Sequence, residues 1–222
     1  GTICFVASLE YCLIVCKSKK INPFIVFCTF ILWSPFLIIF LSLNNFFIIL
    51  LLFLLLVITL ILLKEFSFTI LIFIFILCNS FLIKLENGNY ILLFISSLII
   101  SNDVGAYFFG KLIGGFKLAP SISPSKTWAG FFGGILFALI VSIIICIYIE
   151  ISLLLAMLLA FSIGVLAQLG DLVESILKRK YHLKDSSNFI PGHGGVLDRF
   201  DGYLLVLPFT IMADFFLKNI LY

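Results

Sequence analysis

Long apolar runs, separated by short polar breaks, constrain this chain more than any other feature of its sequence. The runs cover roughly 2–16, 24–43, 46–63, 66–83, 90–110, 128–149, 151–170 and 202–220. Only helices and closed barrels satisfy their backbone hydrogen bonds inside lipid, and continuous runs of this length indicate helices. We therefore expect an all-α, polytopic membrane bundle with about eight transmembrane helices.

The composition excludes an ordinary soluble domain. The chain is 63% hydrophobic and 11% charged, whereas a soluble domain is about 45–50% apolar and about 25% charged. The net charge of +3 gives no indication of a nucleic-acid partner. The first run is short compared with the roughly 20 residues of a full span. We expect that the chain begins inside a helix and that an N-terminal helix precedes Gly1.

The basic residues predict an orientation. In the eight-span topology, one side carries all but two of the 14 Lys and Arg residues, and the other carries only Lys84 and Lys218. Positive charge favours the cytoplasmic side of a membrane. Two long polar loops, 111–127 and 171–201, are then cytoplasmic. We divide the chain into N-terminal helices (1–100) and a C-terminal catalytic region (101–222) within one integral membrane unit.

Asp171, Glu174, Ser175 and Lys178 follow the seventh apolar run at i, i+3, i+4 and i+7. On a helix they form one polar stripe. Two acids one turn apart can hold a hard cation through oxygen, and Lys178 can meet a phosphate. The alternative is a solvated helix face after the membrane exit.

The rest of the second loop combines bases, glycines and two more acids. Glycines around His193 allow the backbone to approach a ligand closely, or simply make a tight loop. Asp198 and Asp201 can cap the last helix or face Asp171 in a magnesium-type site. The clustered bases can bind phosphates or anchor the chain to anionic lipid. They are Lys178, Arg179, Lys180, Lys184 and Arg199.

The first loop and the helix before it supply a second polar group. Asp103 lies in an apolar run with Asn102, so it must face protein or a cavity. Ser123, Lys126 and Thr127 offer hydroxyls and an ammonium suited to a triphosphate. Trp128 is interpreted as an interfacial anchor. Gly130, Gly133 and Gly134 are interpreted as a helix-packing face.

The stretch from Ser175 to Asp201 resembles the signature of the phosphatidate cytidylyltransferases, also called CDP-diacylglycerol synthases. The matching positions begin with Ser175, Lys178 and Arg179, continue through Lys184 and Asp185, and reach His193, Gly194 and Gly195 before Asp198, Arg199 and Asp201. Upstream, Asn102-Asp103 and Ser123 through Gly130 are also similar to the family. The family usually has Lys and Glu where this chain has Ser125 and Ala129. The first hundred residues resemble it only in hydropathy.

This resemblance implies transfer of a cytidylyl group from CTP to phosphatidate, with release of pyrophosphate and a requirement for Mg²⁺. It also implies a bacterial inner-membrane protein whose active site faces the cytoplasm; a homodimer is left open. We predict that Asp171, Asp198 and Asp201 hold the metal with Glu174 nearby. Lys178 and Arg179 complete the predicted catalytic group. The predicted substrate contacts are Asn102, Asp103, Ser123, Lys126, Thr127, Ser175, Lys184, Asp185, His193, Gly194, Gly195 and Arg199.

Three alternatives are compatible with parts of this pattern: a related lipid enzyme, a transporter and an inactive homologue. A CTP-dependent polyprenol-type kinase or a related lipid cytidylyltransferase would use the same groups. An ion-coupled transporter also uses intramembrane acids, but it usually places them near mid-membrane, whereas most acids here gather at the cytoplasmic rim. An inactive homologue is the third, because of Ser125 and Ala129.

Overall fold

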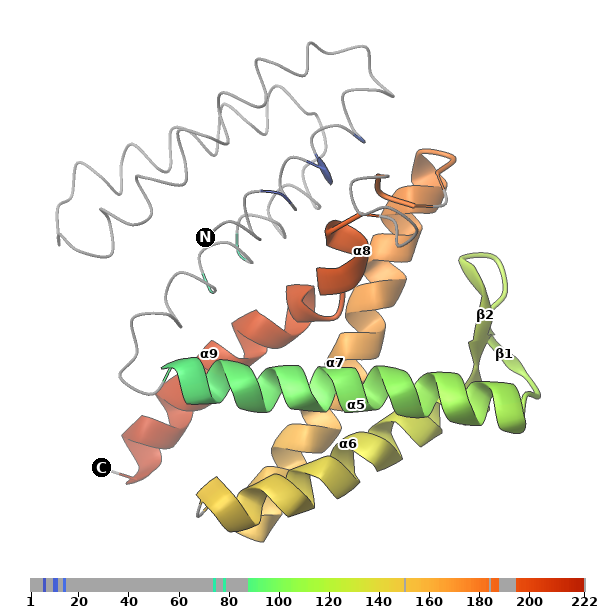
Figure 1. Ribbon diagram of the computed structural model, residues 1–222. Coiled ribbons are helices and arrows are strands. Elements are labelled where there is room, and N and C mark those ends of the chain that lie inside the picture. Colours follow the sequence, from blue (N-terminus) through green and yellow to red (C-terminus); the bar gives the residue numbers. More distant parts are fainter. Residues whose placement is uncertain are drawn as a thin grey trace, which may run out of the picture. The chain divides into compact units, whose positions relative to one another are not determined.

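The described part of the chain is mostly helical, as the apolar runs predict. The computed structural model describes residues 88–149, 151–183, 185–187 and 195–221, together with Val6, Glu10, Tyr11, Ile14, Ile74 and Cys78. The predicted segments 2–16, 24–43, 46–63 and 66–83 otherwise lie outside the described residues. The elements are α5 (Gly88–Leu112), β1 (Lys117–Ala119), β2 (Ser123–Thr127), α6 (Trp128–Ile149), α7 (Leu153–Lys180), α8 (Leu197–Phe200) and α9 (Tyr203–Leu221), as Figure 1 shows.

Within the described ranges, three helices are long and apolar enough to cross a membrane. They are Tyr90–Leu112 in α5, Trp128–Tyr148 in α6 and Leu153–Lys180 in α7. Their positions agree with the predicted runs 90–110, 128–149 and 151–170. The chain is therefore a helical membrane protein, and the total of about eight spans stays a prediction.

The chain divides into two compact units, which we describe separately. The hairpin unit comprises residues 86–176 and 201–206; the loop unit comprises 1–85, 177–200 and 207–222. The functional boundary predicted near residue 100 stays a prediction, because these units group segments by contact and not by role.

Glycines set the distance between α5 and α6 in the hairpin unit. A Cβ added at Gly133 would collide with Cβ of Phe109, and one added at Gly130 would lie 2.7 Å from the carbonyl oxygen of Ala106. The helix backbones can approach this closely only where no side chain intervenes. The prediction of a packing face at Gly130, Gly133 and Gly134 is confirmed.

Polar groups join α7 to the same pair of helices. The Nε2 amide of Gln168 donates to Oδ1 of Asn102 at 3.1 Å and to the carbonyl oxygen of Phe131 at 3.0 Å. Asn102 is fully buried, and Gln168 is nearly so. A Cβ at Gly134 would lie 2.7 Å from Oδ1 of Asn102, so this glycine leaves room for the amide contact. The bond fixes α7 against α5 and α6 at one depth and one rotation.

A short antiparallel hairpin departs from the all-α prediction. β1 pairs with β2, with Lys117 opposite Thr127 and Ala119 opposite Ser123. The sequence predicts only a polar loop over 111–127, because strands this short show too little alternation of apolar and polar residues to be recognised. Thr127 ends the hairpin and caps α6, since its Oγ1 accepts the N–H of Gly130 at 3.1 Å.

The end of α7 lies ten residues beyond the predicted span of 151–170. The hydropathy pattern places Asp171 to Lys180 in a polar loop, whereas the spacing of the polar stripe predicts a continued helix. The structure confirms the helix, which runs to Lys180. The helix stops where His182 takes a left-handed conformation (φ 56°). The N–H groups of Leu183 and His182 then donate to the carbonyls of Lys178 and Arg179, an arrangement that commonly ends helices.

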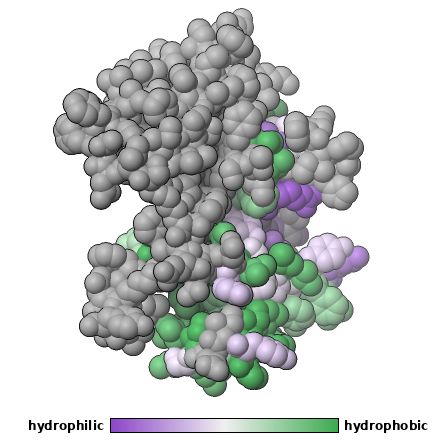
Figure 2. Space-filling view, turned by 60° about the vertical axis from the view of Figure 1, so that its left-hand side comes forward, coloured by the Kyte–Doolittle hydropathy of each residue, from purple (hydrophilic) through white to green (hydrophobic). Residues whose placement is uncertain are grey.

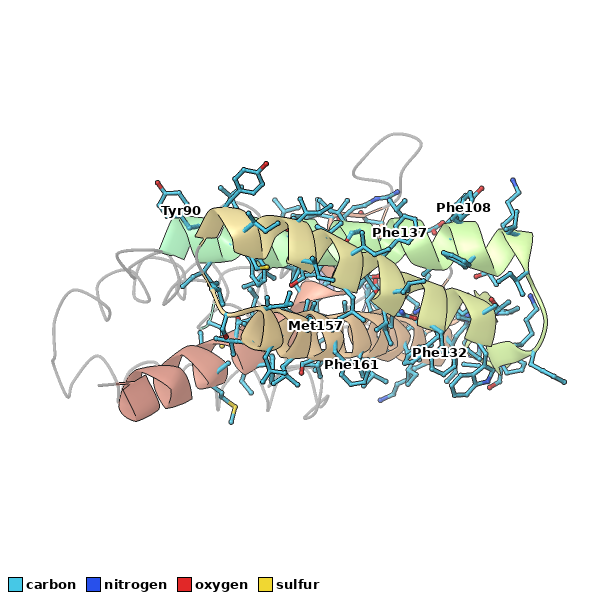
Figure 3. The ribbon with its side chains drawn as sticks, turned by 90° about the horizontal axis from the view of Figure 1, so that it is seen from below. Tyr90, Phe108, Phe132, Phe137, Met157 and Phe161 are labelled. Carbon is cyan, nitrogen blue, oxygen red and sulfur yellow. The ribbon has the colours of Figure 1, made fainter. Side chains whose placement is uncertain are left out.

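The outward faces of the three long helices are apolar. Figure 3 shows Tyr90 and Phe108 pointing away from α5, and both are more than half exposed. Phe161 on α7 is also about half exposed. Hydrophobic residues dominate the visible described surface in Figure 2. A broad exposed apolar surface of this kind is what a helix presents to lipid.

The contact between α5 and α6 predicts the effect of Gly133→Ala. Alanine favours a helix over glycine by about 1 kcal/mol, but overpacking a tight contact costs about 1–3 kcal/mol. The clashing atom is Cβ of Phe109, which no rotamer change can move, so we expect the cost to win and the midpoint of thermal unfolding to fall. Gly164→Ala is the control, because its Cβ would make contacts of 3.4 Å or more. A Gly133→Ala protein as stable as this control would contradict the close approach.

Candidate active site

A cavity in the hairpin unit gathers much of the predicted polar chemistry. Its volume is about 390 Å³, within the range of small-molecule sites. Four segments contribute to its wall: the end of α5, strand β2, the start of α6 and the middle of α7. The lining residues are Asp103, Ala106, Tyr107, Gly110, Lys111, Ser125, Lys126, Thr127, Gly130, Phe131, Gln168 and Asp171.

Lys126 is the main charged contact across this cavity. Its Nζ lies 2.6 Å from Oδ2 of Asp171 and donates to the carbonyl oxygen of Gln168 at 3.3 Å. Because β2 carries Lys126 and α7 carries Asp171, the ion pair ties the hairpin to the helix. The side chains are 19% and 38% exposed, respectively. Both charges therefore remain accessible to a ligand in the cavity.

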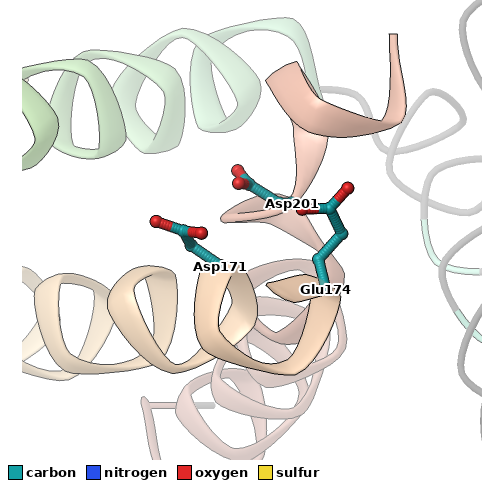
Figure 4. A group of neighbouring side chains, drawn as sticks. All are labelled: Asp171, Glu174 and Asp201. Carbon is teal, nitrogen blue, oxygen red and sulfur yellow. The ribbon is translucent and has the colours of Figure 1, made fainter. Parts of the chain in front are cut away.

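Three carboxylates converge beside this ion pair. Asp171 and Glu174 project from α7, and Asp201 comes from the turn before α9, as Figure 4 shows. One oxygen from each lies within 4.8 Å of the others. Glu174 is almost completely buried. Like charges at about 5 Å repel by roughly 3 kcal/mol per pair at an effective dielectric constant near 20, and a cation placed between them would relieve this repulsion.

The donor set suits a hard divalent cation. All three ligand atoms are carboxylate oxygens, which Mg²⁺ prefers, and Mg²⁺ usually keeps further positions for water and substrate phosphates. Asp171 belongs both to this group and to the cavity wall. A cation held here would therefore lie at the edge of the cavity.

Gly170 lets Asp201 reach this position. A Cβ at Gly170 would lie 2.5 Å from the carbonyl oxygen of Asp201. The turn is also held locally, because the N–H of Gly202 donates to Oδ1 of Asp201 at 2.6 Å and the N–H of Leu204 donates to its carbonyl at 3.2 Å. The absence of a side chain at position 170 is thus a condition for the carboxylate group.

Asp198 belongs to the loop unit and has a different set of contacts. Its Oδ1 accepts from Nζ of Lys178 at 2.9 Å, and its Oδ2 accepts from the backbone N–H groups of Ser186 and Gly195 at 3.0 and 2.9 Å. These contacts fix Lys178 and the start of α8. Its assignment to the metal, alongside Asp171 and Asp201, stays a prediction.

The other predicted residues are placed as follows. Ser175 donates to Oδ1 of Asp171 at 3.3 Å. Arg179 donates to the carbonyl oxygen of Leu183 at the end of α7. Asp185 and Arg199 are exposed. Ser123 starts β2 and, like Asn102, is not among the cavity-lining residues of the described part. Lys184, His193 and Gly194 lie outside the described residues.

Several residues of the site were not predicted. Gln168 lines the cavity and receives Lys126 through its carbonyl, and Ser125 lines it too. A polar side chain inside an apolar run is a signal that could have indicated Gln168, which stands three residues before Asp171 and therefore on the same helix face. Ser125 carried no such signal, because the hairpin that exposes it to the cavity was not expected.

Comparison with known proteins gives a consistent picture. The model of the family described as "Cytidylyltransferase family" matches residues 1–216. A phosphatidate cytidylyltransferase of Bacillus subtilis (strain 168) is 42% identical over 152 residues, which cover 65% of this chain and 56% of that protein. One from Staphylococcus epidermidis is 42% identical over 125 residues, covering 55% and 48%. One from Staphylococcus aureus (strain COL) is 38% identical over the same length. The matches span about half the length of these relatives.

The contact between Gly170 and Asp201 predicts that Gly170→Ala weakens divalent-cation binding. The added Cβ requires the Asp201 carbonyl to move, which displaces its carboxylate from Asp171 and Glu174. We expect Mn²⁺ affinity, followed by electron paramagnetic resonance, to fall at least about tenfold, the scale on which displaced supporting groups affect metal sites. Gly164→Ala on the same helix should bind Mn²⁺ as the parent does. Equal affinity in Gly170→Ala would show that Asp201 is not a ligand.

Proposed function

Because the chain belongs to the cytidylyltransferase family, we propose that it transfers the cytidylyl group of CTP to phosphatidate. A phosphate oxygen of phosphatidate attacks the α-phosphorus of CTP. The bond between that phosphorus and the oxygen bridging to the β-phosphorus breaks. The products are CDP-diacylglycerol and pyrophosphate, so the reaction belongs to phospholipid biosynthesis.

The observation that carries this proposal is the junction of an open cavity, an ammonium and three carboxylates. Lys126 and Asp171 meet on the cavity wall, and Glu174 and Asp201 lie beside Asp171. The attacking phosphate is already a nucleophile, so the protein needs no covalent nucleophile of its own. Catalysis then consists mainly of positioning the two substrates and neutralising their charge.

We propose that Asp171, Glu174 and Asp201 hold Mg²⁺. The ion would supply charge neutralisation on the phosphates of CTP and on the leaving pyrophosphate. The carboxylates would hold the ion, and Ser175 orients Asp171 through its hydrogen bond. Asp198 is retained as a further predicted ligand.

The basic groups have two proposed roles. Lys126 and Lys111 line the cavity and would bind triphosphate oxygens there. Lys178 and Arg179, with the predicted Lys184 and Arg199, would meet the remaining phosphate charge. Thr127 combines a cavity position with its capping bond to Gly130, so it fixes the position of Lys126.

We further propose that the site faces the cytoplasm from a bacterial inner membrane. The bias of Lys and Arg toward the side that carries both long loops supports this orientation. CTP would then reach the cavity from water, while the acyl chains of phosphatidate remain in the bilayer.

Labelled CTP tests the proposed reaction. The protein, reconstituted with phosphatidate and Mg²⁺, should incorporate cytidine into lipid and release pyrophosphate, and chelation of Mg²⁺ should stop both. Asp171→Asn and Glu174→Gln should each lower the rate about 100-fold or more, the scale of losing one group that stabilises the transition state. Ser162→Ala, elsewhere on α7, is the control. Release of CDP in place of pyrophosphate would indicate a lipid kinase and overturn the proposal.

The ion pair of Lys126 with Asp171 leads to a separate prediction. If Asp171 binds the cation, Lys126 competes for the same carboxylate, so Lys126→Gln should tighten Mn²⁺ binding. A partly exposed ion pair contributes at most about 1 kcal/mol, so the gain should be about fivefold or less. The same change should raise KM for CTP, because the phosphates lose an ammonium. Lys117→Gln in β1 removes an equal charge outside the cavity. Weaker Mn²⁺ binding in Lys126→Gln would contradict the competition.

A further inference from the structure

Glu10, in the loop unit, is a buried carboxylate that accepts four hydrogen bonds. Its Oε1 accepts from Oγ of Ser187 at 2.6 Å and from the N–H of Val196 at 2.8 Å. Its Oε2 accepts from Oγ of Ser186 at 3.2 Å and from the N–H of Leu197 at 2.6 Å. All four partners are donors, and Glu10 is only 2% exposed. These partners follow Glu10 by 176 to 187 residues in the sequence.

The four donors belong to two short segments, 186–187 and 196–197, which Glu10 joins. Asp198 also joins the two segments, because it accepts the N–H groups of Ser186 and of Gly195, which directly precedes 196–197. Ser186 therefore contacts both acids, with its hydroxyl on Glu10 and its N–H on Asp198. The two carboxylates together hold this part of the chain around α8.

Gly195 lies against Glu10 and Ser186, where no side chain can be accommodated. A Cβ added there would collide with Oγ of Ser186 and would lie 2.7 Å from Oε2 of Glu10. The glycine therefore provides the room that Glu10 and Ser186 occupy. The predicted role of Gly195 in substrate binding stays a prediction. Its contacts with Glu10 and Ser186 give a separate, steric reason for glycine at this position.

Burial makes the contact of Glu10 energetically important. A buried carboxylate is costly unless it is hydrogen-bonded, and bonds from N–H and O–H groups to a charged acceptor are about twice as strong as neutral ones. An amide in place of the carboxylate would keep the size but would present N–H groups to donors. At least one oxygen's bonds would be lost, leaving buried donors unsatisfied.

We propose that Glu10 is a positioning residue that sets Asp198, and through it Lys178, for the reaction. Glu10 fixes the backbone directly before Asp198, and Asp198 receives Nζ of Lys178 at 2.9 Å. An N-terminal helix residue thus contributes to the C-terminal catalytic region. The role in catalysis rests on the proposed cytidylyl transfer, whereas the anchoring of residues 186–187 and 196–197 does not.

Hydrogen exchange tests the anchoring without reference to activity. In Glu10→Gln, the amides of Val196 and Leu197 should exchange at least about tenfold faster, while those of α5 and α6 keep their protection. Ser187→Ala removes a single donor and should show a smaller shift at the same amides, and Ser162→Ala should show none. Unchanged exchange at Val196 and Leu197 in Glu10→Gln would overturn the proposal, and so would an equal loss of protection throughout the protein.

Kinetics tests the catalytic part. Glu10→Gln should lower kcat about tenfold or more, and Glu10→Asp, which keeps both acceptor oxygens, should recover part of the rate and part of the protection. Loss of kcat with normal exchange would instead make Glu10 a direct substrate contact. If the parent protein transfers no cytidylyl group, the proposed function fails, but the exchange comparison still decides whether Glu10 anchors this segment.

Discussion

The close approach of α5, α6 and α7 is the constraint on which the candidate site depends. Gly133 brings α6 against Phe109, Gly134 admits the amide of Asn102, and Gln168 then ties α7 to both helices. The same residue receives Lys126 through its carbonyl, and Asp171 follows one turn later. Because the outer faces of these helices are apolar, contact with lipid does not favour one rotation of a helix about its axis over another. Glycine contacts and buried hydrogen bonds, including the two from Gln168, make that choice, and the cavity follows from it.

Carboxylates perform two physically different tasks in this protein. Asp171, Glu174 and Asp201 place their oxygens within 4.8 Å of one another, an arrangement that repels itself and that a cation would stabilise. Glu10 and Asp198 instead accept N–H and O–H groups, and Asp198 also receives the ammonium of Lys178. The geometry of the first group suits the proposed cation, whereas the contacts of the second group hold the local backbone and Lys178 in place. Residue type alone does not separate these roles, since all five are acids near apolar segments.

The sequence predicted much of the described fold and part of the site. The helices α5, α6 and α7 begin close to the predicted positions, because lipid demands long apolar helices and leaves a strong signal. The stripe of Asp171, Glu174 and Ser175 is helical, as its spacing indicated. The β1–β2 hairpin was not predicted, because its two strands are too short to show a period. Ser125 was noted only as a departure from the family, and its place on the cavity wall depends on that hairpin.

By itself, the sequence determined that this is a helical membrane protein of the cytidylyltransferase family, because hydropathy and a long motif are local properties of the chain. Only the tertiary structure showed which carboxylates lie close together. Asp201 joins Asp171 and Glu174 because Gly170 leaves space for its backbone, and this is a contact between distant segments. Glu10 gained its partners in the same way, across more than 170 residues. Spacing along a helix reports neighbours on that helix, whereas contacts between elements depend on how closely their backbones can pack.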